Sequence, residues 1–221
     1  MSTFFHKFRY SGAKGFTLIE LLVVSVIILI ITTVILLRQD KFNSSTLLRS
    51  LGYNIALSVR QAQVYGTSVF GVQSEGAIVH APAYGVFFSA TVACPNGGPQ
   101  SCYYLFADLN GNGVRDVGED VKTFSLGTGY TLTKFCATPV SNLATQYCST
   151  DATLPLQYLS VYFKRPNPDA YFATDRIGEQ YAGAYVQVRS QNGDTRSITV
   201  TASGQISVVA PNTAPPAPPA Q

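Results

Sequence analysis

Oxygen-bearing side chains recur at alternate positions in the segment DLNGNGVRDVGE, residues 108–119. This order matches an EF-hand loop, in which such oxygens converge on Ca²⁺ as the chain curls and a glycine takes the sharp turn. Gly113 holds that turn position. The expected ligands are the side chains of Asp108, Asn110, Asn112, Asp116 and Glu119 and the main-chain carbonyl of Val114. Asp116 would act directly or through water, and Glu119 through both oxygens.

The flanks of this loop favour a second interpretation. CYYLFA precedes it and VKTFSL follows it, and both are typical of β-strands rather than of EF-hand helices. Asn, Gly and Asp are also the residues that a β-hairpin turn requires. Arg115 lies inside the loop and subtracts attraction for a cation. Structural calcium and a β-hairpin turn therefore both remain open.

One acidic residue, Glu20, lies inside the apolar run FTLIELLVVSVIILIITTVILL, residues 16–37. As a helix this run would span about 33 Å, enough to cross the hydrocarbon core of a bilayer. A carboxylate in lipid costs several kcal/mol, so its presence indicates a function. Lys7, Arg9 and Lys14 precede the run, which predicts a cytoplasmic N-terminus and an exported body.

The segment KGFTLIE, Lys14–Glu20, resembles the signal of type IV prepilins, in which a basic leader ends in Gly-Phe and an acid follows in a long apolar helix. This resemblance implies that a prepilin peptidase cuts between Gly15 and Phe16 and methylates the new N-terminus of Phe16. It also implies two further partners, which are other pilins or pseudopilins in a filament and an inner-membrane assembly platform. The chain would be a single-pass protein of the bacterial inner membrane before it enters an extracytoplasmic filament.

The chemistry of these residues agrees with the implied roles. Gly15 has no side chain, so an extended segment can enter a narrow protease site. Glu20 needs a cation in an apolar filament core, and the new amino group of Phe16 on a neighbouring subunit would supply one and set the stagger between subunits. A cleaved secretory signal would need a shorter apolar core and a following small-x-small site, whereas RQDKFN follows here.

An exported body gives meaning to the four cysteines, Cys94, Cys102, Cys136 and Cys148. An even count in an oxidising compartment predicts disulfides. Three pairings exist, and we favour Cys94–Cys102 with Cys136–Cys148 because short loops cost least to close. Zinc is disfavoured, since no C-x-x-C spacing occurs and the histidines are His6 and His80.

The elements that position these residues follow from periodicity and composition. We expect a removed leader at 1–15, a transmembrane helix at 16–37, its amphipathic continuation at 38–66, a β-rich domain at 67–209 and a Pro/Ala-rich tail at 210–221. The continuation carries an apolar stripe at helical spacing, namely Leu48, Leu51, Ile55, Val59 and Ala62. The fold class is therefore α+β, with a long N-terminal helix and an antiparallel sheet or sandwich.

Short β-rich runs separated by Gly, Pro, Asn and Ser clusters define the body. The expected strands are Thr67–Gln73, Tyr84–Val92, Ser101–Ala107, Val121–Leu126, Tyr130–Phe135, Gln157–Lys164, Ala184–Arg189, Arg196–Thr201 and Gln205–Val209. Ser203-Gly204 predicts a hairpin turn between the last two. The ending RSITVTASGQISV and the segment NIALSVRQAQVYG resemble the GspH/FimT-type minor pseudopilins.

These features predict a filament subunit of a type II secretion pseudopilus or a type IV pilus, not an enzyme. G-x-S-x-G does not occur, and no histidine accompanies a nucleophile motif. The alternative is a DNA-binding minor pilin of a competence pilus. Nucleic acid is disfavoured because the leader holds the excess charge, leaving twelve basic against twelve acidic residues beyond it. The region Gly204–Ser207 and the tail after it also carry no basic residue.

Overall fold

The computed structural model describes residues 15–68, 70–74, 77–95 and 97–210. By its contacts the chain divides into two compact units, residues 1–42 and residues 43–221. The first unit contains the start of helix α1 (Leu18–Thr67). Its stretch Leu18–Leu36 is long and apolar enough to cross a membrane, and none of it is buried.

In the second unit α1 presents the predicted apolar stripe to the interior. Leu48, Ile55, Val59 and Ala62 are each at most 2 % exposed, and Leu51 packs against them. Spacings of three and four residues put these side chains on one face of the helix, which is why the sequence pattern identified them. The helix continues through Gly66, which the sequence indicated as its end, and stops after Thr67.

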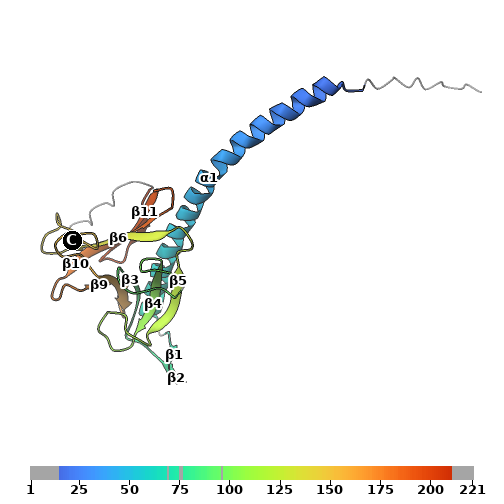
Figure 1. The fold of residues 1–221 in the computed structure, drawn as a ribbon. Helices are drawn as coiled ribbons and strands as arrows, with labels where there is room; N and C mark the ends of the chain where they lie inside the picture. The colour runs from blue at the N-terminus through green and yellow to red at the C-terminus, as the bar shows by residue number, and fades with distance from the viewer. Residues whose placement is uncertain (1–14, 69, 75–76, 96, 211–221) are drawn as a thin grey trace, which may run out of the picture. The chain divides into compact units, whose positions relative to one another are not determined.

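Two five-stranded antiparallel sheets make up the rest of this unit (Figure 1). The first has the order β5-β4-β3-β8-β9, and its strands are β3 (Ala83–Ser89), β4 (Cys102–Asp108), β5 (Asp120–Ser125), β8 (Tyr158–Lys164) and β9 (Ala170–Thr174). The second has the order β12-β11-β10-β6-β7, and its strands are β6 (Thr131–Pro139), β7 (Tyr147–Cys148), β10 (Tyr181–Arg189), β11 (Thr195–Thr201) and β12 (Ile206–Val208). A separate hairpin pairs β1 (Val72–Ser74) with β2 (Ala77–Val79).

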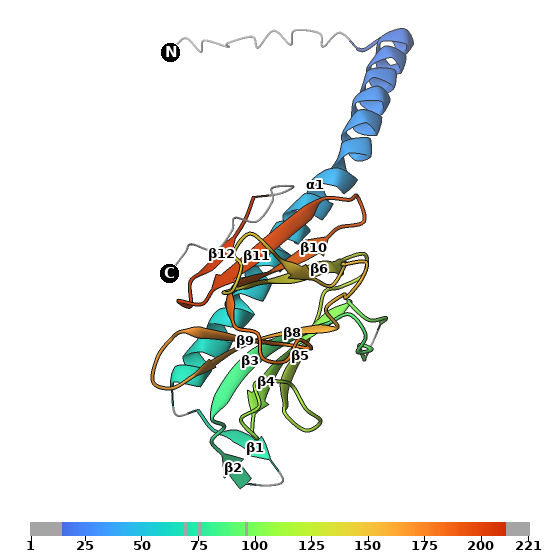
Figure 2. The same ribbon diagram turned by 90° about the vertical axis from the view of Figure 1, so that its left-hand side faces the viewer.

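One core joins the C-terminal half of α1 to both sheets (Figure 2). Ile55 and Val59 meet Val161 of the first sheet and Val186 of the second. The first sheet buries side chains on its other face too, and alternate residues of β4 point to opposite faces. Tyr103 belongs to the main core, whereas Tyr104 and Phe106 form a second cluster with the Cys94–Cys102 disulfide.

The predicted α+β class with antiparallel sheets is confirmed. The strand expected at Thr67–Gln73 is wrong at its start, because Thr67 ends α1 and β1 begins only at Val72. Strands β2, β7 and β9 were not predicted. The expected turn at Ser203-Gly204 joins β11 to β12, where Gly204 has a φ of 78°.

Candidate functional sites

The processing motif lies immediately before and within the first turn of α1. Thr17 caps the helix, since its Oγ1 accepts the amide of Glu20 at 3.3 Å and its carbonyl accepts the amide of Leu21 at 3.2 Å. Phe16 is 83 % exposed, and a Cβ placed on Gly15 would meet no atom within 4 Å. The segment from Gly15 to Phe16 is therefore open to a protease.

Thr17 was not among the predicted site residues, although Thr-x-x-Glu is a known signal for a helix start. Glu20 lies in the first helical turn, where the helix dipole favours a negative charge. A position near the helix start thus accounts for some of the tolerance of this acid in an apolar run. Residues 15–36 contain no lysine or arginine that could pair with the carboxylate.

The loop of residues 108–119 connects β4 to β5, so its flanks are strands. Asp108 ends β4 and is 1 % exposed. Its Oδ1 accepts the amides of Gly111 at 2.8 Å and Asn112 at 3.1 Å, and its Oδ2 accepts the amide of Gly113 at 2.9 Å. One carboxylate therefore organises the first half of the loop.

Gly113 satisfies two requirements at once. Its φ is 76°, which glycine adopts without strain. A Cβ at this position would also lie 2.6 Å from the ring of Tyr162. The turn position predicted from the motif is thus fixed both by backbone conformation and by contact with β8.

Glu119 closes the second half of the loop from the other end. It is 5 % exposed, its Oε1 accepts the amide of Leu109 and its Oε2 accepts the amide of Asp116, both at 2.8 Å. The carboxylate of Asp116 in turn accepts the side-chain amides of Asn110 at 2.7 Å and Asn112 at 2.8 Å. All three carboxylates therefore bind N–H groups of the loop.

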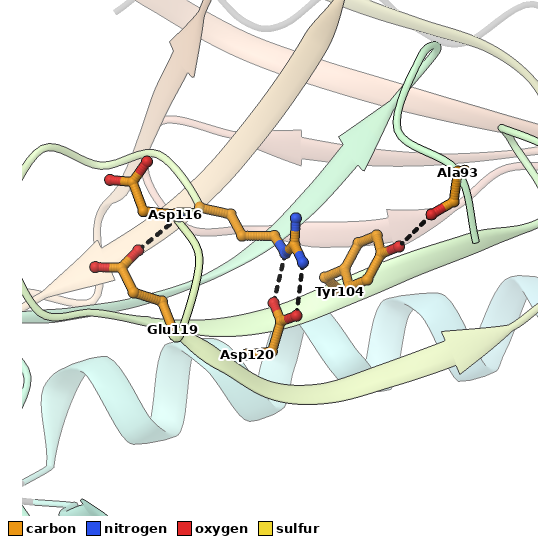
Figure 3. A network of polar contacts seen from close by, with 6 residues as sticks. Ala93, Tyr104, Asp116, Glu119 and Asp120 are labelled. Atoms are coloured by element: carbon orange, nitrogen blue, oxygen red, sulfur yellow. Dashed lines mark hydrogen bonds and ion pairs between the residues drawn. The ribbon is translucent and has the colours of Figure 1, made fainter. Parts of the chain in front are cut away.

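Arg115 contacts an acidic and an aromatic side chain, which was not predicted from the sequence. It pairs with Asp120, and its guanidinium carbon lies 4.0 Å from the ring centroid of Tyr104 (Figure 3). The hydroxyl of Tyr104 donates to the carbonyl of Ala93 at 3.2 Å. The hydrogen bond to Asp120 raises the pKa of Arg115 further. Because Asp120 offsets its charge, Arg115 repels a cation less than the sequence suggested.

The five expected side-chain ligands lie in one loop, but Asn110 and Asn112 turn their NH2 groups, not their oxygens, toward Asp116. Within the described residues, no group of three or more His, Cys, Asp or Glu side chains is arranged to hold a metal ion. The oxygens of Asn110 and Asn112 accept the amides two residues further on, those of Asn112 and Val114. Each of these oxygens has a second lone pair, so calcium binding would require them to turn toward a common point without losing every N–H bond. The calcium assignment stays a prediction.

Both disulfides have the favoured pairing. Cys94–Cys102 ties the loop before β4 to that strand, with 5.8 Å between the Cα atoms. Cys136–Cys148 joins directly opposed residues of β6 and β7, with 4.1 Å between the Cα atoms. Strand β7 has two residues, so the second disulfide fixes an element that hydrogen bonds alone would hold weakly.

Comparison with known proteins agrees with the motif at the N-terminus. No curated protein and no solved structure matches the chain. Residues 10–36 match the prokaryotic N-terminal methylation motif, which covers Gly15, Phe16 and Glu20 and most of the apolar stretch of α1. The chain thus carries the prepilin-type signal of the type IV pilin-like proteins, joined to an α+β domain with two antiparallel sheets.

Proposed function

We propose that this protein is a minor pilin or pseudopilin, a structural subunit of a type II secretion pseudopilus or of a related type IV filament. The observation that carries the proposal is the methylation motif at residues 10–36, of which Leu18–Leu36 form an exposed apolar helix. An apolar helix of this length needs lipid before assembly and other apolar helices afterwards. The resemblance of the β-rich body to GspH/FimT-type subunits supports the assignment to a minor subunit.

In this proposal the prepilin peptidase cuts between Gly15 and Phe16 and methylates Phe16. The basic leader remains cytoplasmic and the domain of two sheets lies outside the membrane. Two disulfides support this topology, because disulfides persist in oxidising compartments. Glu20 then pairs with the amino group of Phe16 on a neighbouring subunit.

Mass spectrometry of the membrane-extracted protein tests the processing step. In cells that contain the peptidase, the expected N-terminus is methylated Phe16. Gly15→Leu should block the cut because a side chain at this position obstructs the extended backbone, whereas Ala13→Leu, two residues earlier, should be processed. An intact leader in the unaltered protein would refute the proposal.

We also propose that the loop of residues 108–119 binds calcium as a structural ion. The order of oxygen-bearing residues supports this, as does the burial of Asp108 and Glu119 at its two ends. The ion would bind the remaining lone pairs of these carboxylates and would join β4 to β5 more tightly.

A further inference from the structure

A groove borders β9, an edge strand of the first sheet. It has a volume of about 810 Å³. Its walls come from β9, from the start of β10 and from the turn between β11 and β12. The side chains that matter most here are Tyr162, Tyr171, Phe172, Tyr181, Asp169 and Glu179.

The backbone of β9 offers hydrogen-bonding groups to this groove. The amide of Ala170 points away from β8, because it donates to the carbonyl of Ala202 at 2.9 Å. The amide of Ala202 continues to the carbonyl of Ala182 in β10 at 2.9 Å. Strand geometry alternates, so the N–H and C=O of Phe172 also point away from β8. The outward-facing amide of Ala170 is thus bonded to the turn at Ala202. Phe172 is the next residue whose N–H and C=O face outward along this edge.

The other edges of the two sheets are short or charged, whereas β9 is covered only in part. The Ala202 turn bonds Ala170, the hydroxyl of Tyr158 donates to the carbonyl of Thr174 at 2.9 Å, and Phe172 lies between these two positions. Strand β5 carries Asp120 and Lys122, and strands β7 and β12 have only two and three residues. Natural proteins protect exposed edges with charges, proline or short strands, because a free edge recruits another chain. Strand β9 has the sequence AYFAT, five residues with neither charge nor proline. An edge that leaves the N–H and C=O of Phe172 open beside a groove is suited to the addition of a short strand.

The charge of the groove indicates what kind of segment fits it. Asp169 and Glu179 line it, and none of its described lining residues is lysine or arginine. Its aromatic walls also suit a cation. Tyr171 already has the ammonium of Lys164 at 4.3 Å from its ring centroid and stacks on Tyr162 at 5.6 Å. The ring of Tyr171 is thus already occupied by a cation, and a basic side chain that enters the groove is attracted chiefly by the carboxylates of Asp169 and Glu179.

We propose that this groove binds an extended segment of a partner polypeptide, which adds as a strand to β9 and places a lysine or arginine side chain near Asp169 and Glu179. This activity is separate from processing and filament assembly. The tail of this same chain does not have the required chemistry. Its twelve residues, APNTAPPAPPAQ, contain five prolines and no basic residue, so it lacks amides for a strand ladder.

The test uses the full chain in neutral detergent micelles and a fluorescent peptide with three Val-Lys repeats and blocked ends. Fluorescence anisotropy measures its Kd. Two peptides serve as controls: one has methyl groups on alternate backbone nitrogens, and the other has glutamate in place of lysine. The first control should bind about tenfold more weakly or worse, because it loses strand hydrogen bonds but keeps its charge. The second should not bind.

Protein variants locate the binding to the groove. Asp169→Asn with Glu179→Gln should weaken the Val-Lys peptide about tenfold. The matched control Asp194→Asn, in the turn between β10 and β11, should leave the Kd unchanged. Bound peptide should also slow hydrogen exchange at the amide of Phe172. The proposal is overturned if the Val-Lys peptide fails to bind, if backbone methylation leaves its Kd unchanged, or if the groove double variant binds as the unaltered protein does.

Discussion

Gly66 lies in the last turn of α1, where the helix backbone touches the first sheet. A Cβ placed on it would lie 2.3 Å from the carbonyl oxygen and 2.8 Å from the carbonyl carbon of Phe163 in β8. Strand β8 is paired on both sides, to β3 and to β9, so these backbone atoms cannot shift cheaply. Close approach of helix to sheet, rather than the end of the helix, explains this glycine.

Gly66→Ala should therefore destabilise the domain by about 2 kcal/mol, the range typical of overpacking. The loss should appear even though alanine favours a helix over glycine by about 1 kcal/mol. Denaturant unfolding of the full chain in detergent micelles measures it. Gly98→Ala is the matched control, because a Cβ there would meet nothing within 4 Å. Equal unfolding midpoints for the two variants would refute the close-approach argument.

Tyr103 connects the first sheet to α1 through a buried hydrogen bond. Its hydroxyl lies 3.0 Å from Oγ of Ser58, and its side chain is 2 % exposed. Burial raises the pKa of Tyr103 to about 12, against a smaller lowering by the Ser58 hydroxyl. Burial also raises the pKa of other tyrosines, namely Tyr84, Tyr158, Tyr162 and Tyr181.

The folded state holds the phenolic proton of Tyr103 more tightly than the unfolded state, whose pKa is about 10. Its contribution is therefore fully present below about pH 10 and is lost as the pH rises towards about 12. The loss is on the order of 2 kcal/mol. Melting temperatures recorded from about pH 8 to about pH 12 should fall less steeply for Tyr103→Phe. Tyr53→Phe, at an exposed tyrosine, should keep the original slope, and identical slopes for all three proteins would contradict the assignment.

Among the elements, the loop of residues 108–119 should respond to calcium. Millimolar Ca²⁺ should raise the melting temperature of the full chain in micelles, because a ligand that binds only the folded state stabilises it. At about 100 times the Kd the gain would be about 2.7 kcal/mol. Chelation should reverse the gain, and Mg²⁺ should give much less because it requires tighter octahedral geometry.

Two isosteric variants separate cation binding from loop closure. Asp116→Asn keeps an oxygen for the side-chain amides of Asn110 and Asn112 but removes a charge. Asp194→Asn removes a charge outside the loop. The first should lose most of the calcium response while melting nearly normally without Ca²⁺, and the second should keep the response. If Ca²⁺ leaves the melting temperature unchanged, residues 108–119 are a self-closed hairpin loop.

The elements that the sequence predicted best are those with a strong period. The stripe from Leu48 to Ala62 repeats at helical spacing, and its burial followed from that spacing alone. Strands β3, β4, β8 and β11 are rich in aromatic or β-branched residues and lie between turn residues, and their predicted cores are correct. The favoured disulfide pairing rested on short loops, and the structure has the same two bonds.

The elements that were missed depend on contacts distant in sequence. Strand β9 is short and without clear alternation, and pairing with β8 makes it a strand. Strand β7 has two residues and is held by Cys136–Cys148. The bond of Glu119 to the amide of Leu109, at the opposite end of its loop, also depends on how the loop folds. Residue types identified these carboxylates as a group but did not give the direction of each oxygen.

In the whole molecule, the largest exposed apolar element described is the N-terminal half of α1, which a single chain leaves unburied. Within the described part of the chain, every side chain from Leu18 to Leu36 is exposed. Polar groups in this stretch are satisfied locally, since Ser25 donates to the carbonyl of Leu22 at 2.8 Å and Thr33 donates to that of Leu29 at 2.7 Å. Glu20 differs, because its carboxylate carries a charge that only a cation can offset. A filament of such helices would supply that cation from a neighbouring Phe16.

Glu20→Ala should therefore leave membrane insertion intact, or improve it slightly, while incorporation into filaments falls. Removing the charge lowers the cost of the helix in lipid but leaves the Phe16 amino group of a neighbour unpaired in an apolar core. Fractionation measures insertion, and the ratio of sheared filament to membrane-bound protein measures assembly. Glu20→Gln should behave like Glu20→Ala, because it keeps the size and loses the charge. Ser25→Ala removes a locally bonded hydroxyl from the same helix and should assemble normally.

Thr17→Ala separates helix capping from charge pairing, because it removes the bond to the amide of Glu20 and keeps the carboxylate. It should therefore cost about 1 kcal/mol of helix stability and leave assembly nearly unchanged. Normal assembly of Glu20→Gln would show that the charge of Glu20 does not set the stagger of subunits. A defect in Thr17→Ala equal to that of Glu20→Gln would show that Glu20 acts through the helix start.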